Sequence, residues 1–209
     1  MNIGTAENRT IDARNPRTGE LDYSFEVTPT SEIENTANEL RANQPKWAAL
    51  TVDERADILR EWARIVSKSS DLLEALVTDT GRYFIATAEI ENLAKSIEGW
   101  HMIGRQVFAE QEPIQSSHPS VIYSHQYKPF EVVGIVGPWN FPFLISLIDL
   151  LPALMAGSAA ITKPSEITPR FIKPLQETLE QVPELHAVCR YIEGDGQTGQ
   201  DLINNVDAV

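Results

Sequence analysis

Residues 131–142 read Glu131-Val-Val-Gly-Ile-Val-Gly-Pro-Trp-Asn-Phe-Pro142, an apolar run that leads directly into a turn rich in proline and glycine. The run Val132–Val136 is nearly all apolar, as expected for a strand that is covered on both faces of a parallel sheet. The mostly apolar segment Ile145–Ala156 has the length of a helix, and Ser158–Thr162 indicates a second small buried strand. A strand, a helix and a second strand in this order predict a βαβ unit.

The same alternation continues along the rest of the sequence. Val188–Glu193 is a third predicted strand, and a glycine-rich turn at residues 194–199 leads into another helix. The last residues, up to Val209, indicate the start of a fourth strand. These patterns predict that residues 131–209 form the first half of a doubly wound, Rossmann-like parallel sheet in an α/β protein.

The sequence that precedes this sheet is predicted to be mainly helical. Residues 1–30 are polar and indicate an extended arm or short strands. Four amphipathic segments follow, and two of them begin with capping-box patterns, at Ser31 with Glu34 and at Thr51 with Glu54. We therefore expect a helical region ahead of the sheet.

Three parts of the chain are expected from these patterns. Residues 1–115 are assigned to the arm and its helices, and residues 116–130 to a hairpin with a strand at Ser120–Tyr127. The remaining part, residues 131–209, is the half-sheet described above.

The composition limits the classes of function. The 30 acidic and 17 basic residues give a formal net charge of −13, which repels phosphate backbones and anionic lipid. We therefore expect no nucleic-acid or membrane partner, and the apolar stretch Phe143–Thr162 predicts a buried helix and strand because it contains Asp149 and Pro152. A single cysteine and the lack of an apolar run at the start of the sequence favour a cytoplasmic location. The histidines show no metal-ligand spacing, so no metal is expected.

The first candidate for chemistry is the turn at residues 137–142, directly after the central predicted strand. Open α/β sheets bind ligands at the carboxyl ends of their strands. A turn stiffened by two prolines can present the Asn140 amide as a fixed hydrogen-bond donor to an oxyanion. The alternative is a stiff structural loop with Trp139 packed in the core.

Two further turns follow the next predicted strands. In the first, the Lys163 ammonium and the Glu166 carboxylate could hold two ribose hydroxyls, and the carboxylate would disfavour a 2′-phosphate. The alternative is a solvated ion pair beside a helix cap. The second turn, Gly194-x-Gly196-x-x-Gly199, opens a helix, where backbone amides can accept phosphate; the alternative is a glycine-rich turn without a ligand.

Taken in order, these segments strongly resemble the aldehyde dehydrogenase superfamily. The resemblance rests on the motif at residues 131–142, on Leu-Pro-Ala-Leu-Met-Ala-Gly-Ser-Ala at 151–159 and on Lys-Pro-Ser-Glu at 163–166. It is dense over residues 129–207 and looser but continuous from Asn-Pro-Arg-Thr-Gly at 15–19 onward.

The resemblance implies an aldehyde-dehydrogenase-like helical region followed by a Rossmann-like sheet. It also implies oxidation of an aldehyde to a carboxylic acid with NAD or NADP, and Glu166 favours NAD. By this resemblance Asn140 is the oxyanion donor, Lys163 and Glu166 contact the adenosine ribose, and the hairpin at 116–130 takes part in homo-oligomer formation. The implied cofactor-binding positions are Gly137, Pro138, Trp139, Asn140, Lys163, Pro164, Ser165, Glu166, Gly196 and Gln197.

The family's nucleophilic cysteine and general-base glutamate are expected downstream of Val209. Cys189 does not occupy the nucleophile's motif, and its place in a predicted strand indicates a small buried apolar side chain. We therefore expect this chain to be the N-terminal portion of an aldehyde dehydrogenase, and we expect the chain to be inactive by itself. The alternatives are a short chain that binds a nucleotide or a partner without catalysis, and a functionless truncation product.

Overall fold

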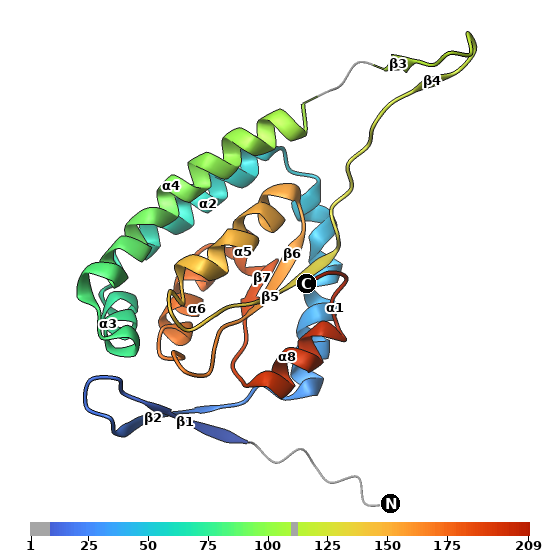
Figure 1. Ribbon diagram of the computed structural model, residues 1–209. Coiled ribbons are helices and arrows are strands. Elements are labelled where there is room, and N and C mark those ends of the chain that lie inside the picture. The colour runs from blue at the N-terminus through green and yellow to red at the C-terminus, as the bar shows by residue number, and fades with distance from the viewer. Residues whose placement is uncertain (1–8, 110–112) are drawn as a thin grey trace, which may run out of the picture.

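A parallel sheet of three strands forms the centre of the computed structural model, which describes residues 9–109 and 113–209 (Figure 1). The strands are β5 (Val132–Val136), β6 (Ala159–Lys163) and β7 (Cys189–Tyr191), in the spatial order β5-β6-β7. The predicted strands and their parallel arrangement are therefore confirmed, although β7 is shorter than the sequence indicates.

The register of the sheet sets the positions of the turns that follow the strands. Val136 at the end of β5 lies opposite Lys163 at the end of β6. On the other edge of β5, Ala208 forms a parallel bridge with Val133. This bridge confirms the predicted start of a fourth strand.

Helices cover both faces of the sheet, which explains why its strands are so apolar. One face packs against α5 (Leu144–Ala156), which joins β5 to β6, and against α6 (Ile172–Glu180). The opposite face packs against α1 (Thr30–Ala48) and α8 (Gly196–Ile203), as Figure 1 shows. The one-turn helix α7 (Pro183–His186) precedes β7.

Three more helices form an outer layer over α5 and α6. They are α2 (Val52–Val66), α3 (Ser70–Thr80) and the long α4 (Tyr83–Val107), and α2 and α4 pack against each other and against α5. The helical region and the sheet share one core. Its largest fully buried side chains include Trp62, Phe143, Phe171, Ile33, Leu40, Leu59, Leu72, Leu76, Leu93, Ile97, Leu147 and Leu150.

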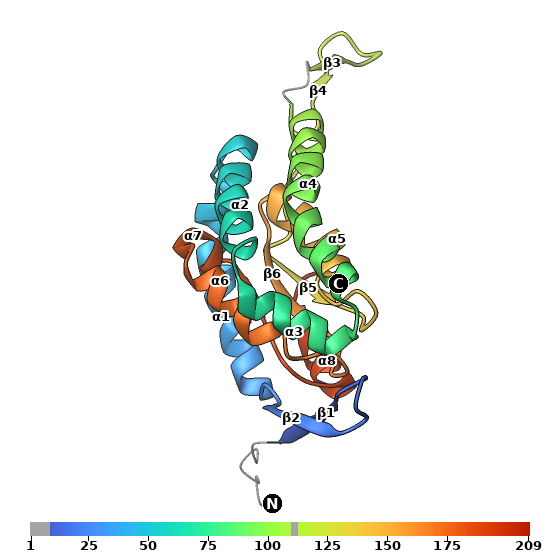
Figure 2. The same ribbon diagram turned by 90° about the vertical axis from the view of Figure 1, so that its left-hand side faces the viewer.

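Two hairpins lie at opposite ends of the molecule (Figures 1 and 2). The first pairs β1 (Thr10–Arg14) with β2 (Leu21–Glu26), which confirms short strands in the expected arm; residues 1–8 of that arm lie outside the described residues. The second pairs β3 (Ile114–Gln115) with β4 (Ile122–Tyr123) beyond the end of α4. The predicted strand Ser120–Tyr127 is therefore wrong in length, because the exposed hairpin offers it a partner of only two residues.

The helix ends test the capping predictions. The capping box of Thr51 and Glu54 is confirmed at the start of α2, where each side chain accepts the backbone N–H of the other residue. The predicted cap at Ser31 is wrong, since α1 already begins at Thr30 with the extended Pro29 in the cap position. Ser31 consequently lies inside the first turn.

Buried donors of α1 and α2 hold the C-terminal end of α5. The Trp47 indole Nε1 donates to the Leu154 carbonyl at 2.8 Å, and the Arg55 Nε donates to the Met155 carbonyl at 3.0 Å. Carbonyls at a helix end have no partner within the helix, so these donors satisfy groups that would otherwise be buried unpaired. They fix the helical region on the sheet.

Candidate functional site

The three turns selected from the sequence lie at one edge of the sheet, because each follows the carboxyl end of a parallel strand. The first two are in direct contact. The Gly137 N–H donates to the Lys163 carbonyl at 2.9 Å, and a Cβ built on Gly137 would lie 3.6 Å from the Cα of Pro164. The turn that carries Asn140 and the turn that ends at Glu166 therefore start side by side.

The Lys163 side chain connects the second turn to the third. Its Nζ donates to the carbonyls of Pro164 and Gly194, both at 2.8 Å, and lies 3.6 Å from the Glu166 carboxylate. Burial lowers the pKa of this ammonium, whereas the carboxylates of Glu166 and Asp195 oppose that shift. Lys163 thus joins all three turns through its backbone and side chain.

The alternative of a solvated ion pair beside a helix cap is wrong for Lys163. Its side chain is only 4% exposed, and Ser165 accepts the N–H of Ile167 in a local turn while α6 begins only at Ile172. Glu166 keeps 40% of its side chain exposed. The pair therefore combines a buried cation with an accessible carboxylate.

Gly194 is required by the shape of the third turn. Its φ of +155° lies in a region that side chains rarely adopt, and a Cβ there would lie 2.0 Å from the Thr198 hydroxyl oxygen. A Cβ on Gly196, by contrast, would have no other atom within 4 Å, and a Cβ on Gly199 would face the Lys163 side chain at 3.6 Å. The turn leaves open space at the start of α8.

The N-terminus of α8 already has a negatively charged cap. The Asp195 carboxylate accepts the N–H of Gln197 at 3.0 Å and pairs with the Arg9 guanidinium at 2.8 Å. These donors hold the pKa of Asp195 below its usual range. The Asp195 side chain and Arg9 therefore already satisfy part of this helix start, and the phosphate-accepting role considered from the sequence stays a prediction.

The first turn presents its polar residues to the outside. Trp139 is 56% exposed, so the alternative of a tryptophan packed in the core is wrong. Asn140 is also exposed, Pro138 is half-buried, and the Asn140 carbonyl accepts a hydrogen bond from the Arg82 guanidinium. The Asn140 amide is consequently available to a ligand at the sheet edge.

Two residues beside this turn were not selected from the sequence. Arg82 lies at the start of α4, and Glu89 lies about two turns further along and is 1% exposed. The sequence could have indicated Glu89, because it lies on the same helix face as Ala86 and Leu93, at a position where an apolar residue is expected. A buried carboxylate at such a position indicates a specific partner.

Within residues 9–109 and 113–209 no three His, Cys, Asp or Glu side chains gather as a metal site would require. None of the helices in the same ranges combines the length and apolar character needed to cross a bilayer. Cys189 is fully buried, and burial raises the pKa of its thiol to about 12. Its predicted role as a small buried side chain is confirmed.

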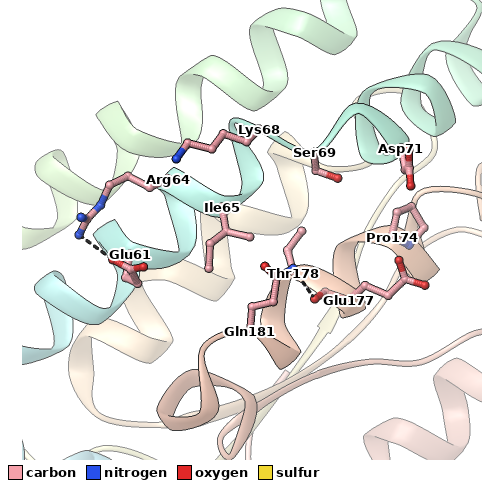
Figure 3. A pocket seen from close by; sticks show the side chains of 10 residues that line it. All are labelled: Glu61, Arg64, Ile65, Lys68, Ser69, Asp71, Pro174, Glu177, Thr178 and Gln181. Atoms are coloured by element: carbon pink, nitrogen blue, oxygen red, sulfur yellow. Dashed lines mark hydrogen bonds and ion pairs between the residues drawn. The ribbon is translucent and has the colours of Figure 1, made fainter.

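A surface cavity of about 480 Å³ lies away from these turns, between α2, α3 and α6 (Figure 3). Its wall carries both signs of charge, and Arg64 is paired with Glu61 across 2.9 Å. None of the residues selected from the sequence lines it. The cavity therefore adds nothing to the candidate site.

These features agree with the comparison to known families. The model of the aldehyde dehydrogenase family matches residues 3–209, and the chain belongs to this family. The resemblance seen in the motifs is thereby confirmed.

Solved structures agree in fold. A putative aldehyde dehydrogenase, PutA from Anabaena variabilis, is 40% identical with a TM-score of 0.90, over 95% of this chain and 42% of that one. An NADP-dependent enzyme from E. coli is 27% identical with a TM-score of 0.78, over 94% of this chain and 41% of that one. A betaine aldehyde dehydrogenase from Staphylococcus aureus, solved with NAD+, shares the fold at 23% identity with a TM-score of 0.82, over 96% of this chain and 41% of that one. The chain thus spans about 42% of the length of the first of these.

Proposed function

We propose that residues 1–209 act as the N-terminal part of an NAD(P)-dependent aldehyde dehydrogenase that oxidises an aldehyde to a carboxylic acid. This proposal rests mainly on Lys163, which connects the three turns. Its carbonyl accepts the Gly137 N–H of the first turn, and its Nζ donates to the Gly194 carbonyl of the third. Family membership supports the same reaction. Titration of the chain with NAD+, with binding read from tryptophan emission, tests the cofactor-binding part of this proposal.

The cofactor would lie across the three turns. The accessible Glu166 carboxylate can accept hydrogen bonds from ribose hydroxyls, and the neighbouring Lys163 ammonium supports its charge. The open space beside Gly196 and Gln197 can receive the adenine side, and Gly137, Pro138 and Trp139 would line the nicotinamide-facing part of the cleft. When bound, the nicotinamide accepts the hydride that leaves the substrate.

Glu166 also sets a preference between the two cofactors. Its negative charge would repel the 2′-phosphate of NADP, so we favour NAD. In the complete enzyme, Glu166→Gln should lower the ratio of kcat/KM for NAD to kcat/KM for NADP, because the substitution removes the charge that repels the 2′-phosphate. An unaltered ratio would count against this contact.

Asn140 would stabilise the oxyanion that forms when a nucleophile adds to the aldehyde carbonyl. Its amide would donate a hydrogen bond to that oxygen, and a donor of this kind contributes most where charge develops in the transition state. In the complete enzyme, Asn140→Ala should lower kcat by ~10²–10³-fold. A kcat equal to that of the unmodified enzyme would exclude the role.

The attacking thiolate must come from outside residues 1–209. Cys189 is the one cysteine of the sequence, and its buried thiol with a pKa of about 12 cannot serve as the nucleophile at neutral pH. We therefore propose that this chain supplies cofactor-binding residues and one oxyanion donor, and that it does not supply the nucleophile.

Partners and location complete the proposal. The substrate is a small-molecule aldehyde. Residues 116–130, which include β4 of the second hairpin, would join copies of the enzyme in a homo-oligomer, since exposed apolar side chains such as Ile122 and Tyr123 lie there. The negative charge of −13 argues against nucleic acid as a partner. A single buried cysteine suits the reducing cytoplasm.

A further inference from the structure

The junction between α3 and α4 reaches the turn that carries Asn140. The Arg82 guanidinium donates from Nη2 to the Asn140 carbonyl, and it lies 5.0 Å from the centre of the Phe141 ring, in the range of a cation–π contact. The first contact holds the Asn140–Phe141 peptide plane through its carbonyl oxygen, and the second holds the Phe141 side chain that directly follows this plane. Arg82 therefore fixes the orientation of the backbone on the C-terminal side of Asn140.

Glu89 holds the other end of the same turn. Its Oε2 accepts the N–H of Phe143 at 3.0 Å and the N–H of Leu144 at 2.9 Å, at the start of α5. These are N–H groups that the first turn of a helix leaves without a partner, and α5 has no side-chain cap of its own. Burial raises the pKa of Glu89, while these two N–H donors and the positive charge of Arg82 oppose the shift.

We propose that Arg82 and Glu89 form a clamp that positions the Asn140 amide for its oxyanion. The inference rests on the oxyanion role proposed above for Asn140. Because both ends are held, the backbone between them has little conformational freedom. An oxyanion donor is effective only when its N–H is oriented before the negative charge develops on the substrate oxygen. Both are positioning residues, because their contacts are with the turn rather than with a reacting atom.

The clamp can be tested in the 209-residue chain by NMR relaxation. The Phe141 amide reports on the peptide plane that Arg82 holds, and its order parameter should fall from ~0.85 to below ~0.6 in Arg82→Met. Arg105→Met is the matched control, since Arg105 is an exposed arginine at the far end of α4. The control should leave the Phe141 order parameter unchanged. Equal order parameters in the two variants would overturn the clamp.

Hydrogen exchange tests the second half of the clamp. Glu89→Gln keeps one acceptor oxygen but loses the charge, so the Phe143 and Leu144 amides should exchange at least ~10-fold faster. Amides of β6 serve as the internal reference for global unfolding. Unchanged exchange at both positions would overturn the role of Glu89.

Kinetics in the complete enzyme connect the clamp to chemistry. Arg82→Met should lower kcat by ~10–10²-fold with KM for the aldehyde within ~2-fold, because an oxyanion donor acts mainly in the transition state. Arg82→Lys keeps a charged donor and should recover part of that loss. A raised KM with unchanged kcat would overturn the positioning role.

Asn140→Ala distinguishes a failure of the oxyanion role from a failure of the clamp alone. If it leaves kcat unchanged, the oxyanion role and the purpose of the clamp both fail. If it lowers kcat while Arg82→Met does not, the oxyanion role stands and the clamp alone is refuted.

Discussion

Replacing Arg55 with methionine should weaken the junction between the helical region and the sheet more than any exposed substitution on α2. Arg55 is 4% exposed, and it donates to the Met155 carbonyl at 3.0 Å and to the Leu50 carbonyl at 2.6 Å. Two longer contacts, at 3.4 and 3.3 Å, reach the carbonyls of Trp47 and Ala48 at the end of α1. Methionine fills a similar volume but donates to none of them.

The magnitude follows from the two short hydrogen bonds. A hydrogen bond from a charged group contributes roughly 1.5–3 kcal/mol, so two of them contribute about 3–6 kcal/mol. Burial opposes the guanidinium charge and lowers the Arg55 pKa, and the methionine removes that penalty. We expect the free energy of unfolding to fall by about 2–4 kcal/mol.

Urea unfolding followed by circular dichroism measures this loss in the 209-residue chain. With an m-value of about 2 kcal/mol per M, the midpoint should fall by about 1–2 M. Arg64→Met is the matched control on the same helix, because Arg64 is 68% exposed and pairs with Glu61 only at the surface. A loss below about 1 kcal/mol for Arg55→Met, or equal losses in both variants, would show that the buried Arg55 hydrogen bonds do not stabilise this junction.

Two further predictions concern the segment between β7 and the glycine turn, and the turn itself. Burial raises the pKa of Glu193 to about 7, so the folded chain should lose stability as pH rises from the ordinary value near 4.5 through 7. Glu193→Gln should therefore leave the free energy of unfolding unchanged near pH 4.5 and raise it by about 1–2 kcal/mol at pH 8, after allowance for the partial exposure of the side chain. Urea unfolding at both pH values measures this effect. A difference between variant and unmodified chain that is the same at both pH values would contradict it. Gly194→Ala should cost more than about 2 kcal/mol in the same assay because its Cβ would meet Thr198, whereas Gly196→Ala should stay within about 1 kcal/mol; similar losses would contradict the conformational argument.

Much of the fold could be predicted from local patterns. The apolar run at Val132–Val136 and its flanking turn identify a strand of a parallel sheet without any tertiary information. The Thr51 capping box is similarly local, because both partners lie within one turn. Ser31 matches the same pattern, yet the helix begins at Thr30. The four-residue pattern from Ser31 to Glu34 does not include Pro29, which occupies the cap position.

The candidate site divides in the same way. Asn140, Lys163 and Glu166 could be selected because each lies in a short motif after a strand, and parallel strands place their carboxyl ends together. Arg82 and Glu89 were missed because their partners lie more than 50 residues away, as the separations of 58 and 54 residues show. The capping charge of Asp195 on α8 was also missed, and its partner Arg9 lies in the N-terminal arm. Contacts of this kind depend on the folded chain rather than on spacing.

The three joined turns are proposed to bind a nicotinamide cofactor. The most direct test is a titration of the 209-residue chain with NAD+ while tryptophan emission is recorded. Trp139 is 56% exposed at the edge of the site, whereas Trp47 and Trp62 are buried and Trp100 is partly buried on α4. We predict saturable quenching that disappears in Trp139→Phe and weakens by ~10-fold or more in Glu166→Ala, with NADP+ binding less tightly than NAD+. Quenching that does not saturate, or that is the same in Glu166→Ala, would contradict the claim.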